Sequence, residues 1–377
     1  MLKKLFKPIH RYIKYSDKLL LLMCIGCSAL SILLLYGMIA SDMPNVTMRQ
    51  IKVQYVASAI GIVSAVVVSC IDYHFIAKLW KLYAPLSIAL VVLTFFFGLR
   101  RGEADDRAWL PLPLGMSLQP AELMKIAFIM TFALHLSLVR ERVNSPLQLL
   151  LLCIHGAVPI LLVRKQGDDG TMLIFIFIFT SMLFASGINW KYIAAVIVSA
   201  VALSPLAWNY LLSNDQRKRF LVTYNLESDP LDKGFQQLEG LTALGSGKLW
   251  GIGVFAKKHW WTPEIHNDFI FTFIGQSFGL VGCTAVILLL AAIMARFLYN
   301  SRHAMDDLGR FICIGVFSMF AFQAILNIGM CLAVLPVIGI TLPLISAGGT
   351  SVITSYLGIG LALSVTYRSR KPEFDRD

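Results

Sequence analysis

The sequence predicts an all-α polytopic membrane protein with ten transmembrane helices. Of its 377 residues, 57% are hydrophobic and 15% are charged, whereas soluble domains have about 45–50% apolar and about 25% charged residues. The apolar residues recur in runs of about 20, the length that an α-helix needs to cross a hydrocarbon core about 30 Å thick. Lysine and arginine between these runs are divided unevenly between the two sides, as the positive-inside rule describes for multi-pass proteins.

Ten apolar runs are expected to form the spanning helices, at residues 17–40, 51–71, 74–98, 119–139, 146–163, 171–187, 190–209, 268–298, 310–335 and 342–366. The shorter runs can span because the bilayer and the flanking residues adjust to hydrophobic mismatch. Asn327, Gly329 and Pro336 interrupt the ninth run, so its outer end is the least sharply defined.

The short loops orient the chain. The side that holds both termini carries 18 lysine and arginine residues in its short segments, against 7 on the other side. This excess indicates that both termini are cytoplasmic. The basic start precedes an apolar run too long for a cleaved signal peptide, so we interpret that run as a first anchor. The basic residues of the start are Lys3, Lys4, Lys7, Arg11, Lys14 and Lys18.

The longest polar segment, residues 210–267, lies between the seventh and eighth predicted helices and is expected on the outer side. Its own charge does not decide its side, because long segments are translocated largely regardless of charge. It has an amphipathic stretch at 232–244, but it lacks the strand pattern of an independent domain. Residues 1–377 are therefore expected to form a single membrane domain.

Neither the charge nor the cysteines indicate another class of protein. The net charge of +11 does not point to nucleic acid, because the basic residues lie in short loops rather than on a folded basic surface. The cysteines lie within apolar runs, without disulfide or zinc spacing, and we interpret them as small buried hydrophobic residues. They are Cys24, Cys27, Cys70, Cys153, Cys283, Cys313 and Cys331.

Polar residues at the start of the fourth predicted helix form a first candidate cluster. Its members are Arg107, Trp109, Gln119, Pro120, Glu122 and Lys125. Glu122 and Lys125 are three residues apart, so they share a helix face and can pair. Pro120 and Glu122 also suit a helix N-terminus. The pair could hold the bundle together, or it could line a polar cavity.

A second cluster, residues 164–171, precedes the sixth predicted helix and contains Asp168 and Asp169 between glycines. It could be a solvated loop, or its glycines could let the backbone approach a ligand.

The third cluster ends the long segment with Glu264, His266, Asn267 and Asp268. Asp268 could cap the following helix. Alternatively it could serve as a general base if partial desolvation raises its pKa.

Two further segments allow a structural and a functional interpretation. Lys257 and Lys258 precede a histidine and two tryptophans, a pattern that suits either the membrane interface or phosphate contact. Residues 342–351, including Ser346, are rich in small side chains, which suit either helix packing or a broken backbone that lines a cavity.

Six short motifs follow one another along nearly the whole chain. They are Arg107-x-Trp109, Gln119-Pro120-x-Glu122-x-x-Lys125, Gln166-x-Asp168-x-Gly170-Thr171, Gly245-Ser246-Gly247, Pro263-Glu264-x-His266-x-Asp268-Phe269-Ile270-Phe271 and Pro343-x-x-Ser346-x-Gly348-Gly349. Their order and membrane positions resemble the SEDS family (shape, elongation, division and sporulation). The brief N-terminal tail and residues 227–231 are more similar to the elongation type, RodA, than to the division type, FtsW.

The resemblance implies a ten-helix peptidoglycan glycosyltransferase of the inner membrane. Such an enzyme would polymerise lipid II at the outer face during cell elongation and shape maintenance, with a class B penicillin-binding protein, a transpeptidase, as partner. The essential aspartate of the family corresponds to Asp268, and its fourth-helix glutamate and lysine correspond to Glu122 and Lys125. Its aspartate before the sixth helix corresponds to Asp168.

The chain departs from the family pattern at Gly167, Asp169, Leu241, Ile265, Gln276, Ser277, Thr341 and Ala347. Gln276 and Ser277, for example, replace an acidic pair. These departures bear on fine substrate contacts and on regulation by the partner, and they leave Asp268 in place.

The implied reaction needs one base. A sugar hydroxyl attacks an anomeric carbon that carries a lipid diphosphate, and because diphosphate is a good leaving group, no second carboxylic acid is required. Asp268 is the candidate base. Arg107, Lys125, Lys257 or Lys258 would hold the phosphates, and Mg²⁺ or Mn²⁺ could assist, although no metal-ligand spacing is visible. The other candidate substrate contacts are Trp109, Gln119, Glu122, Asp168, His266 and Ser346.

Two other functions fit a ten-helix protein with polar residues. A flippase for the same lipid precursor would place polar groups through the whole membrane depth and show a two-half repeat. Here the charges gather on the outer side and no repeat is visible. A non-catalytic scaffold for a penicillin-binding protein is the other alternative.

Overall fold

The computed structural model describes residues 14–99, 107–111, 117–229, 231–232 and 234–370. Within them, eight helices are long and apolar enough to cross a membrane, which confirms a multi-pass membrane protein. These are α2 (Lys18–Ala40), α3 (Met48–Cys70), α5 (Trp80–Phe97), α6 (Pro120–Val139), α7 (Pro146–Gln166), α12 (Ile270–Arg302), α13 (Asp307–Cys331) and α14 (Gly349–Arg370). Two shorter apolar helices are α8 (Asp169–Ala185) and α9 (Trp190–Leu206). The number of ten crossings stays a prediction.

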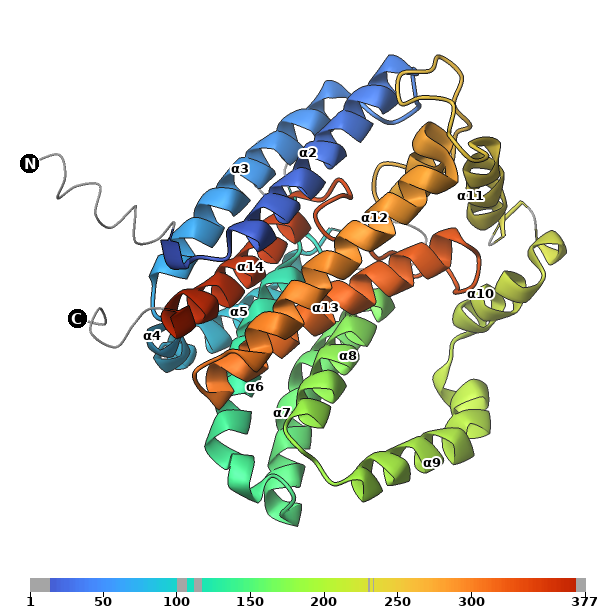
Figure 1. The fold of residues 1–377 in the computed structure, drawn as a ribbon. Helices are drawn as coiled ribbons and strands as arrows, with labels where there is room; N and C mark the ends of the chain where they lie inside the picture. The colour runs from blue at the N-terminus through green and yellow to red at the C-terminus, as the bar shows by residue number, and fades with distance from the viewer. Residues whose placement is uncertain (1–13, 100–106, 112–116, 230, 233, 371–377) are drawn as a thin grey trace, which may run out of the picture.

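The two ends of the described chain lie at the same end of the bundle (Figure 1), where Arg370 Nη1 donates a hydrogen bond to the Ser16 carbonyl at 3.5 Å. The side of the membrane that this end faces stays a prediction. Some of the basic residues that support this prediction lie outside the described residues, namely Lys3, Lys4, Lys7, Arg11, Arg100, Arg101, Lys371 and Arg376. Pro230, in the stretch that resembles the elongation type, also lies outside them.

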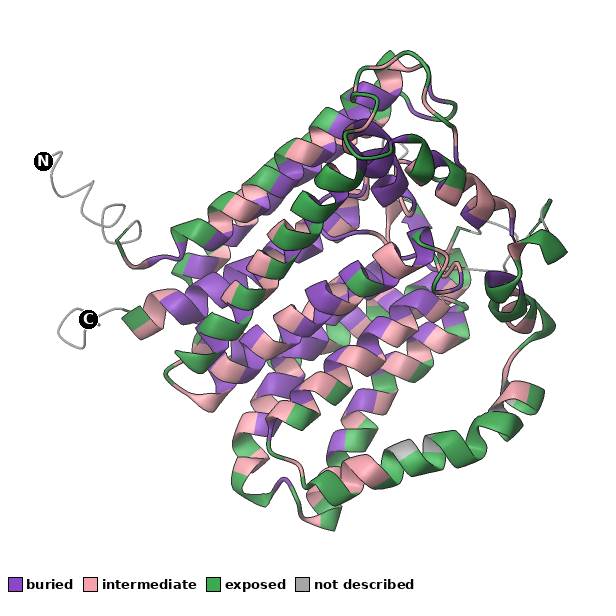
Figure 2. Ribbon diagram, turned by 45° about the vertical axis from the view of Figure 1, so that its right-hand side comes forward, coloured by how far each residue is buried: buried purple, intermediate pink, exposed green. Residues whose placement is uncertain are grey.

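The most buried helices are α13 and α14. α14 packs along α3, and α13 packs against α6, α8 and α12. α9 lies at the edge of the bundle (Figure 1), and its surface is largely exposed (Figure 2). All seven cysteines are free, but only five are buried: Cys70 and Cys153 are exposed, so the expectation of burial is wrong for these two.

Most predicted spans match the observed helices to within a few residues, but the third and the tenth differ more. The run 74–98 contains two helices, α4 (Tyr73–Lys78) and α5, which part at Leu79. The last run starts late, because residues 332–348 form a loop and α14 begins only at Gly349. Gly339 and Leu344 in this loop have left-handed backbone angles (φ 67° and 64°), which a continuous helix does not allow.

The described part of the long segment contains four short helical elements, of which α11 packs against the bundle. They are the π-helical turn η3 (Ala207–Leu211), α10 (Asn214–Tyr224), the 3₁₀ turn η4 (Leu226–Ser228) and α11 (Phe235–Ser246). The amphipathic stretch becomes α11, which packs against α12. At their contact a Cβ on Gly247 would lie 1.9 Å from the Gly275 carbonyl oxygen, so this motif position requires glycine. Elsewhere, β1 (Leu110–Pro111) pairs with β2 (Ser117–Leu118), and η2 (Arg140–Arg142) follows α6.

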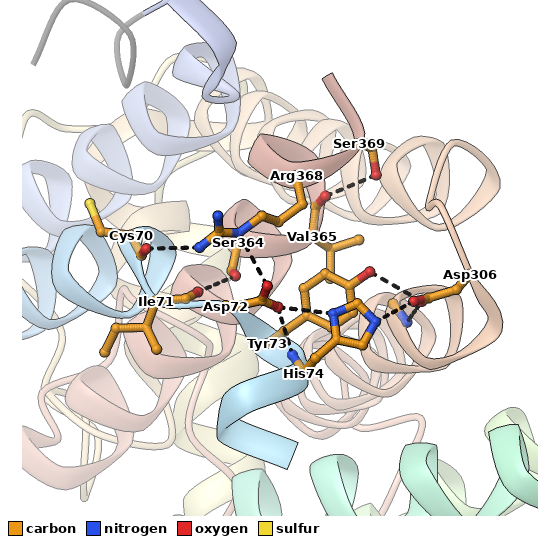
Figure 3. Close-up of polar contacts among 11 residues, drawn as sticks. Cys70, Ile71, Asp72, Tyr73, His74, Asp306, Ser364, Val365, Arg368 and Ser369 are labelled. Carbon is orange, nitrogen blue, oxygen red and sulfur yellow. Dashed lines mark hydrogen bonds and ion pairs between the residues drawn. The ribbon is translucent and has the colours of Figure 1, made fainter. Parts of the chain in front are cut away.

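A polar cluster joins three segments at the end of the bundle that holds both described ends (Figure 3). The His74 ring lies between two carboxylates, 2.9 Å from Asp72 Oδ1 and 2.5 Å from Asp306 Oδ2. Tyr73 donates its hydroxyl to Asp306 (3.1 Å), and Arg368 of α14 lies 3.9 Å from Asp72. Burial alone would raise the pKa of Asp72, but the His74 hydrogen bonds and the Arg368 charge lower it below its usual range. The cluster therefore ties α4 and the start of α13 to the end of α14.

Candidate functional site

Asp268 lies in a tight turn in front of α12. The backbone N–H groups of Asn267 and Phe269 both donate to the Glu264 carbonyl, at 2.9 and 3.2 Å. Glu264 has a left-handed φ of 52°, which is uncommon outside glycine and concentrates at functional sites. The interpretation of Asp268 as a helix cap is wrong: α12 begins at Ile270, and among the described residues no hydrogen bond joins the Asp268 carboxylate to its N-terminus.

The backbone at Asp268 is held by neighbouring elements. Asn327 Nδ2 donates to the Asp268 carbonyl at 2.7 Å, and Cys331 Sγ donates to the same oxygen at 3.5 Å, both from α13. Ser346 Oγ donates to the Asn267 carbonyl at 2.6 Å. The loop before α14 and the end of α13 thus fix the residue from two sides.

The Asp268 side chain is half-buried and lies in a negatively charged environment. Burial raises its pKa to about 7, and the charges of Glu264 and Asp168 act in the same direction. Gly339 of the loop 332–348 faces it, since a Cβ there would lie 3.7 Å from Asp268 Oδ2. A carboxyl group with a pKa near neutrality can accept a proton from a substrate hydroxyl.

Asp168 connects the motif that contains Gln119 and Glu122 to this site. Its Oδ1 accepts from the Thr171 N–H at 2.8 Å and caps α8, while its Oδ2 accepts from Gln119 Nε2 at 2.7 Å. Burial raises the pKa of Asp168, the hydrogen bonds from Thr171 oppose this, and the charge of Glu122 adds to the increase. The structure therefore brings together Gln119, Glu122 and Asp168, and Asp168 is close enough to raise the pKa of Asp268.

The predicted pair of Glu122 and Lys125 is confirmed. Lys125 Nζ lies 2.8 Å from Glu122 Oε1, and the two residues are 1% and 5% exposed. With its amide turned so that the oxygen faces Lys125, Gln323 of α13 accepts a further hydrogen bond at 2.9 Å. The cation is therefore neutralised inside the bundle rather than exposed.

Arg107 and Trp109 lie at the C-terminal end of α5. Arg107 Nη1 donates to the Phe95 carbonyl at 3.4 Å, and the Leu99 N–H donates to the Trp109 carbonyl at 2.7 Å. The hairpin that follows reaches α14, where Thr350 Oγ1 donates to Ser117 at 3.4 Å.

His266 lies in the turn beside Asp268. Its carbonyl accepts from the Ala347 N–H at 2.9 Å, next to Ser346. Burial lowers the pKa of its ring, although the charge of Glu264 opposes this.

Lys257 and Lys258 are exposed, and among the described residues no contact joins them to Asp268. Their stretch is anchored elsewhere. His259 Nδ1 lies 2.8 Å from Ser41 Oγ at the end of α2, and the Gln276 amide exchanges two hydrogen bonds with the Trp260 backbone, at 2.7 and 2.9 Å. These two hydrogen bonds explain why position 276, one of the departures from the family pattern, carries an amide. An ionised carboxylate could accept from the Trp260 N–H but could not donate to the Trp260 carbonyl.

The sequence interpretation did not assign Asn327 or Gly339 to the site. Asn327 carried one usable signal, because a polar side chain inside a membrane helix is costly and usually functional. Gly339 carried none, because its proximity to Asp268 depends on the path of the loop. The part of the chain that the structure describes has no group of three histidine, cysteine or acidic residues able to hold a metal ion, so no resident metal site is assigned.

Comparison with known proteins identifies the relatives of this chain. A family model described as a cell cycle protein, covering FtsW, RodA and SpoVE, matches residues 16–371. The protein named "Probable peptidoglycan glycosyltransferase FtsW" of Geobacter metallireducens is 30% identical over 97% of each chain. "Peptidoglycan glycosyltransferase MrdB" of Escherichia coli is 30% identical over 93% of each chain.

Solved structures share the fold. A chain from a peptidoglycan synthase complex that coordinates polymerization and crosslinking superposes with a TM-score of 0.80 at 24% identity, covering 95% of this chain and 99% of that one. The rod shape determining protein RodA of Thermus thermophilus gives a TM-score of 0.69 at 23% identity, covering 95% of this chain and 98% of that one.

Proposed function

The chain belongs to the FtsW, RodA and SpoVE family of cell cycle proteins, and on this premise we propose how its site works as a peptidoglycan glycosyltransferase. Relatives that match nearly the whole chain are named peptidoglycan glycosyltransferases, so the activity belongs to cell-wall synthesis. The substrate is lipid II, and Asp268 is the general base. The observation that carries this role is a carboxylate with a pKa of about 7, held in place by α13 and the loop 332–348.

In the reaction, the Asp268 carboxylate takes the proton of the attacking sugar hydroxyl. The hydroxyl oxygen bonds to the anomeric carbon of the second substrate, and the bond from that carbon to the diphosphate oxygen breaks. The diphosphate leaves with the electron pair. A base with a pKa near the working pH combines a sizeable ionised fraction with strong proton affinity.

Positive charge must balance the leaving diphosphate. Arg107, Lys257 and Lys258 are the candidates, and Lys125 would have to share its charge with Glu122. Mg²⁺ or Mn²⁺ would arrive bound to the diphosphate of the substrate. Gln119, Asp168, His266 and Ser346 would shape the pocket around the sugars.

The setting follows from topology and resemblance. The chain would lie in the cytoplasmic membrane with ten crossings, both termini in the cytoplasm and residues 210–267 outside, so that Asp268 meets lipid II at the outer face. Its partner would be a class B penicillin-binding protein, supported by the synthase complex whose chain shares the fold. We assign it to the elongation type on residues 227–231 alone, since the FtsW and MrdB relatives match equally at 30% identity and do not distinguish the two types.

The test is polymerisation of purified lipid II by Asp268→Asn protein together with its partner synthase. Because asparagine keeps the shape but cannot accept the proton, glycan formation should fall by roughly 10²–10⁴-fold, while folding and lipid II binding persist. Asp42→Asn, an exposed carboxylate in the loop after α2, is the matched control and should remain active. Near-normal product from folded Asp268→Asn protein would remove Asp268 from the reaction.

A further inference from the structure

A single amide in α13 connects the two segments that surround the Asp268 carboxylate. Asn327 is fully buried (0% exposed), and its Nδ2 donates to the carbonyl of Asp268 and to the carbonyl of Ile340, each at 2.7 Å. Asp268 and Ile340 are far apart in the sequence. Asn327 is therefore a bridge between the turn before α12 and the loop 332–348.

The loop that Asn327 holds contacts both carboxylate segments. Gly339, the neighbour of Ile340, faces Asp268 Oδ2, and the Ile338 carbonyl oxygen lies 2.4 Å from where a Cβ on Gly170 would be. Gly170 follows Asp168 by two residues. A shift of this loop would therefore change the space beside Asp268 and beside Asp168 together.

Few side chains can form this bridge. A carboxamide has two N–H donors in one plane and can serve two carbonyls, whereas serine can donate once and leucine cannot donate. The Asn327 oxygen, in contrast, is buried and has no partner among the described residues. An unpartnered buried oxygen opposes folding, so what the amide contributes at this position comes from its two N–H donors.

We propose that Asn327 is a positioning residue, which fixes the Asp268 carboxylate against the loop 332–348 and thereby against the reacting hydroxyl of the sugar. This inference rests on the function proposed above for Asp268. Asn327 does not reach the substrate in this arrangement and acts through the backbone of its neighbours.

Loss of the bridge should change the pH dependence of the reaction, which loss of a purely structural contact would leave unchanged. The titratable groups around Asp268 are Glu264 and His266 of its own turn, Asp168 before α8 and Cys331 of α13. If the loop moves away, the carboxylate gains water, and its pKa falls from about 7 toward the usual range. The acid limb of the pH–rate profile should then move to lower pH.

The experiment compares Asn327→Leu with Asn300→Leu in the full-length protein with its partner synthase. Asn300 is a matched control, because it is 2% exposed in α12, donates to Asp17 at 3.1 Å and also has an unpartnered oxygen. Asn327→Leu should lower kcat by roughly 10²-fold, the size expected for a misplacement of about 1 Å. Its KM for lipid II should stay nearly constant, and its acid limb should shift. Asn300→Leu should lower thermal stability and leave kcat and the acid limb of the pH–rate profile unchanged.

Asn327→Ser keeps one hydrogen-bond donor and serves as the second variant if Asn327→Leu does not fold. Its kcat and the position of its acid limb should lie between those of the wild type and of Asn327→Leu. An unchanged kcat per folded molecule, or a loss without any shift of the acid limb, would overturn the positioning role. Asp268→Asn is assayed alongside. If that variant is active, the proposed base itself fails, whatever the result at position 327.

Discussion

Burial of Asp268 has opposite consequences for its proposed role as a base and for folding. The partial burial that raises its pKa to about 7 makes it a stronger base, but it also makes the ionised form less favourable in the folded protein. In the unfolded chain the pKa of this side chain is that of an ordinary aspartate, about 3.9. Between these two values the folded state binds the proton and the unfolded state does not, so stability falls as the pH rises through this window.

We therefore expect Asp268→Asn to be more thermostable than wild type at pH 8. The gain should shrink below pH 7 and vanish near pH 4, where the wild-type carboxyl is protonated in both states. Wild-type polymerisation should decline below about pH 7, because the base becomes protonated. Melting curves and initial rates between pH 5 and 8.5 measure both effects. A thermostability difference that does not depend on pH would contradict the raised pKa.

The pair of Glu122 and Lys125 shows how charges are tolerated inside the bundle. Removing one partner leaves the other as an unpaired buried charge, at a cost of about 3–5 kcal/mol. Glu122→Ala should therefore lower folded yield more than the double variant Glu122→Ala/Lys125→Ala. Yield of monodisperse protein in detergent is the measurement. Simple addition of the two single effects would mean that the two residues do not interact, despite their 2.8 Å contact.

At the scale of elements, α12 is interrupted where the long segment 210–267 packs against it. Gly279 has φ 63° and ψ −161°, a backbone region used almost only by glycine. The freed N–H groups of Leu280 and Val281 donate to the carbonyls of Lys248 and Leu249, at 2.9 and 3.2 Å. A broken helix is tolerated at membrane depth where other protein groups satisfy its backbone.

Gly279→Ala should destabilise the protein by about 1–3 kcal/mol or more, because it forces this backbone conformation on alanine and places a Cβ 2.4 Å from the Leu249 carbonyl oxygen. Gly245→Ala is the control, since a Cβ there meets nothing within 4 Å, and alanine in a helix is favoured over glycine by about 0.5–1 kcal/mol. Thermal unfolding followed by fluorescence compares the two variants. Equal stability of both would argue against the strained kink.

For the whole molecule, the orientation in the membrane decides whether Asp268 can meet lipid II. We expect an impermeant thiol reagent added outside intact cells to label Asn214→Cys in α10 and not Met305→Cys between α12 and α13, as the asymmetry of basic residues requires. Both positions are exposed, and the exposed native residues Cys70 and Cys153 are first replaced by serine. Labelling of position 214 only from the cytoplasmic side would reverse the topology and exclude catalysis at the outer face.

The positions of the helices could be predicted from the sequence because the length and hydrophobicity of a span are local properties. The predicted runs correspond to the observed helices to within a few residues, except at Leu79 and in the loop 332–348, which takes up the end of the ninth run and the start of the tenth. The pairing of Glu122 with Lys125 was also predictable, because residues three apart on a helix are neighbours whatever the helix packs against. The late start of α14 could not be predicted in this way, because Asn327 of α13 and the turn before α12 hold the loop 332–348.

By itself, the sequence determined the membrane class, the helical elements and the motifs that include Asp268, since hydropathy and residue order need no tertiary contact. Only the tertiary structure decided that Asp268 is no helix cap, that Asp168 lies close enough to raise its pKa, and that Asn327 links its turn to the loop 332–348. A pKa and a hydrogen-bond bridge depend on burial and on distances of a few ångströms between segments remote in sequence. Those quantities exist only once the helices have packed.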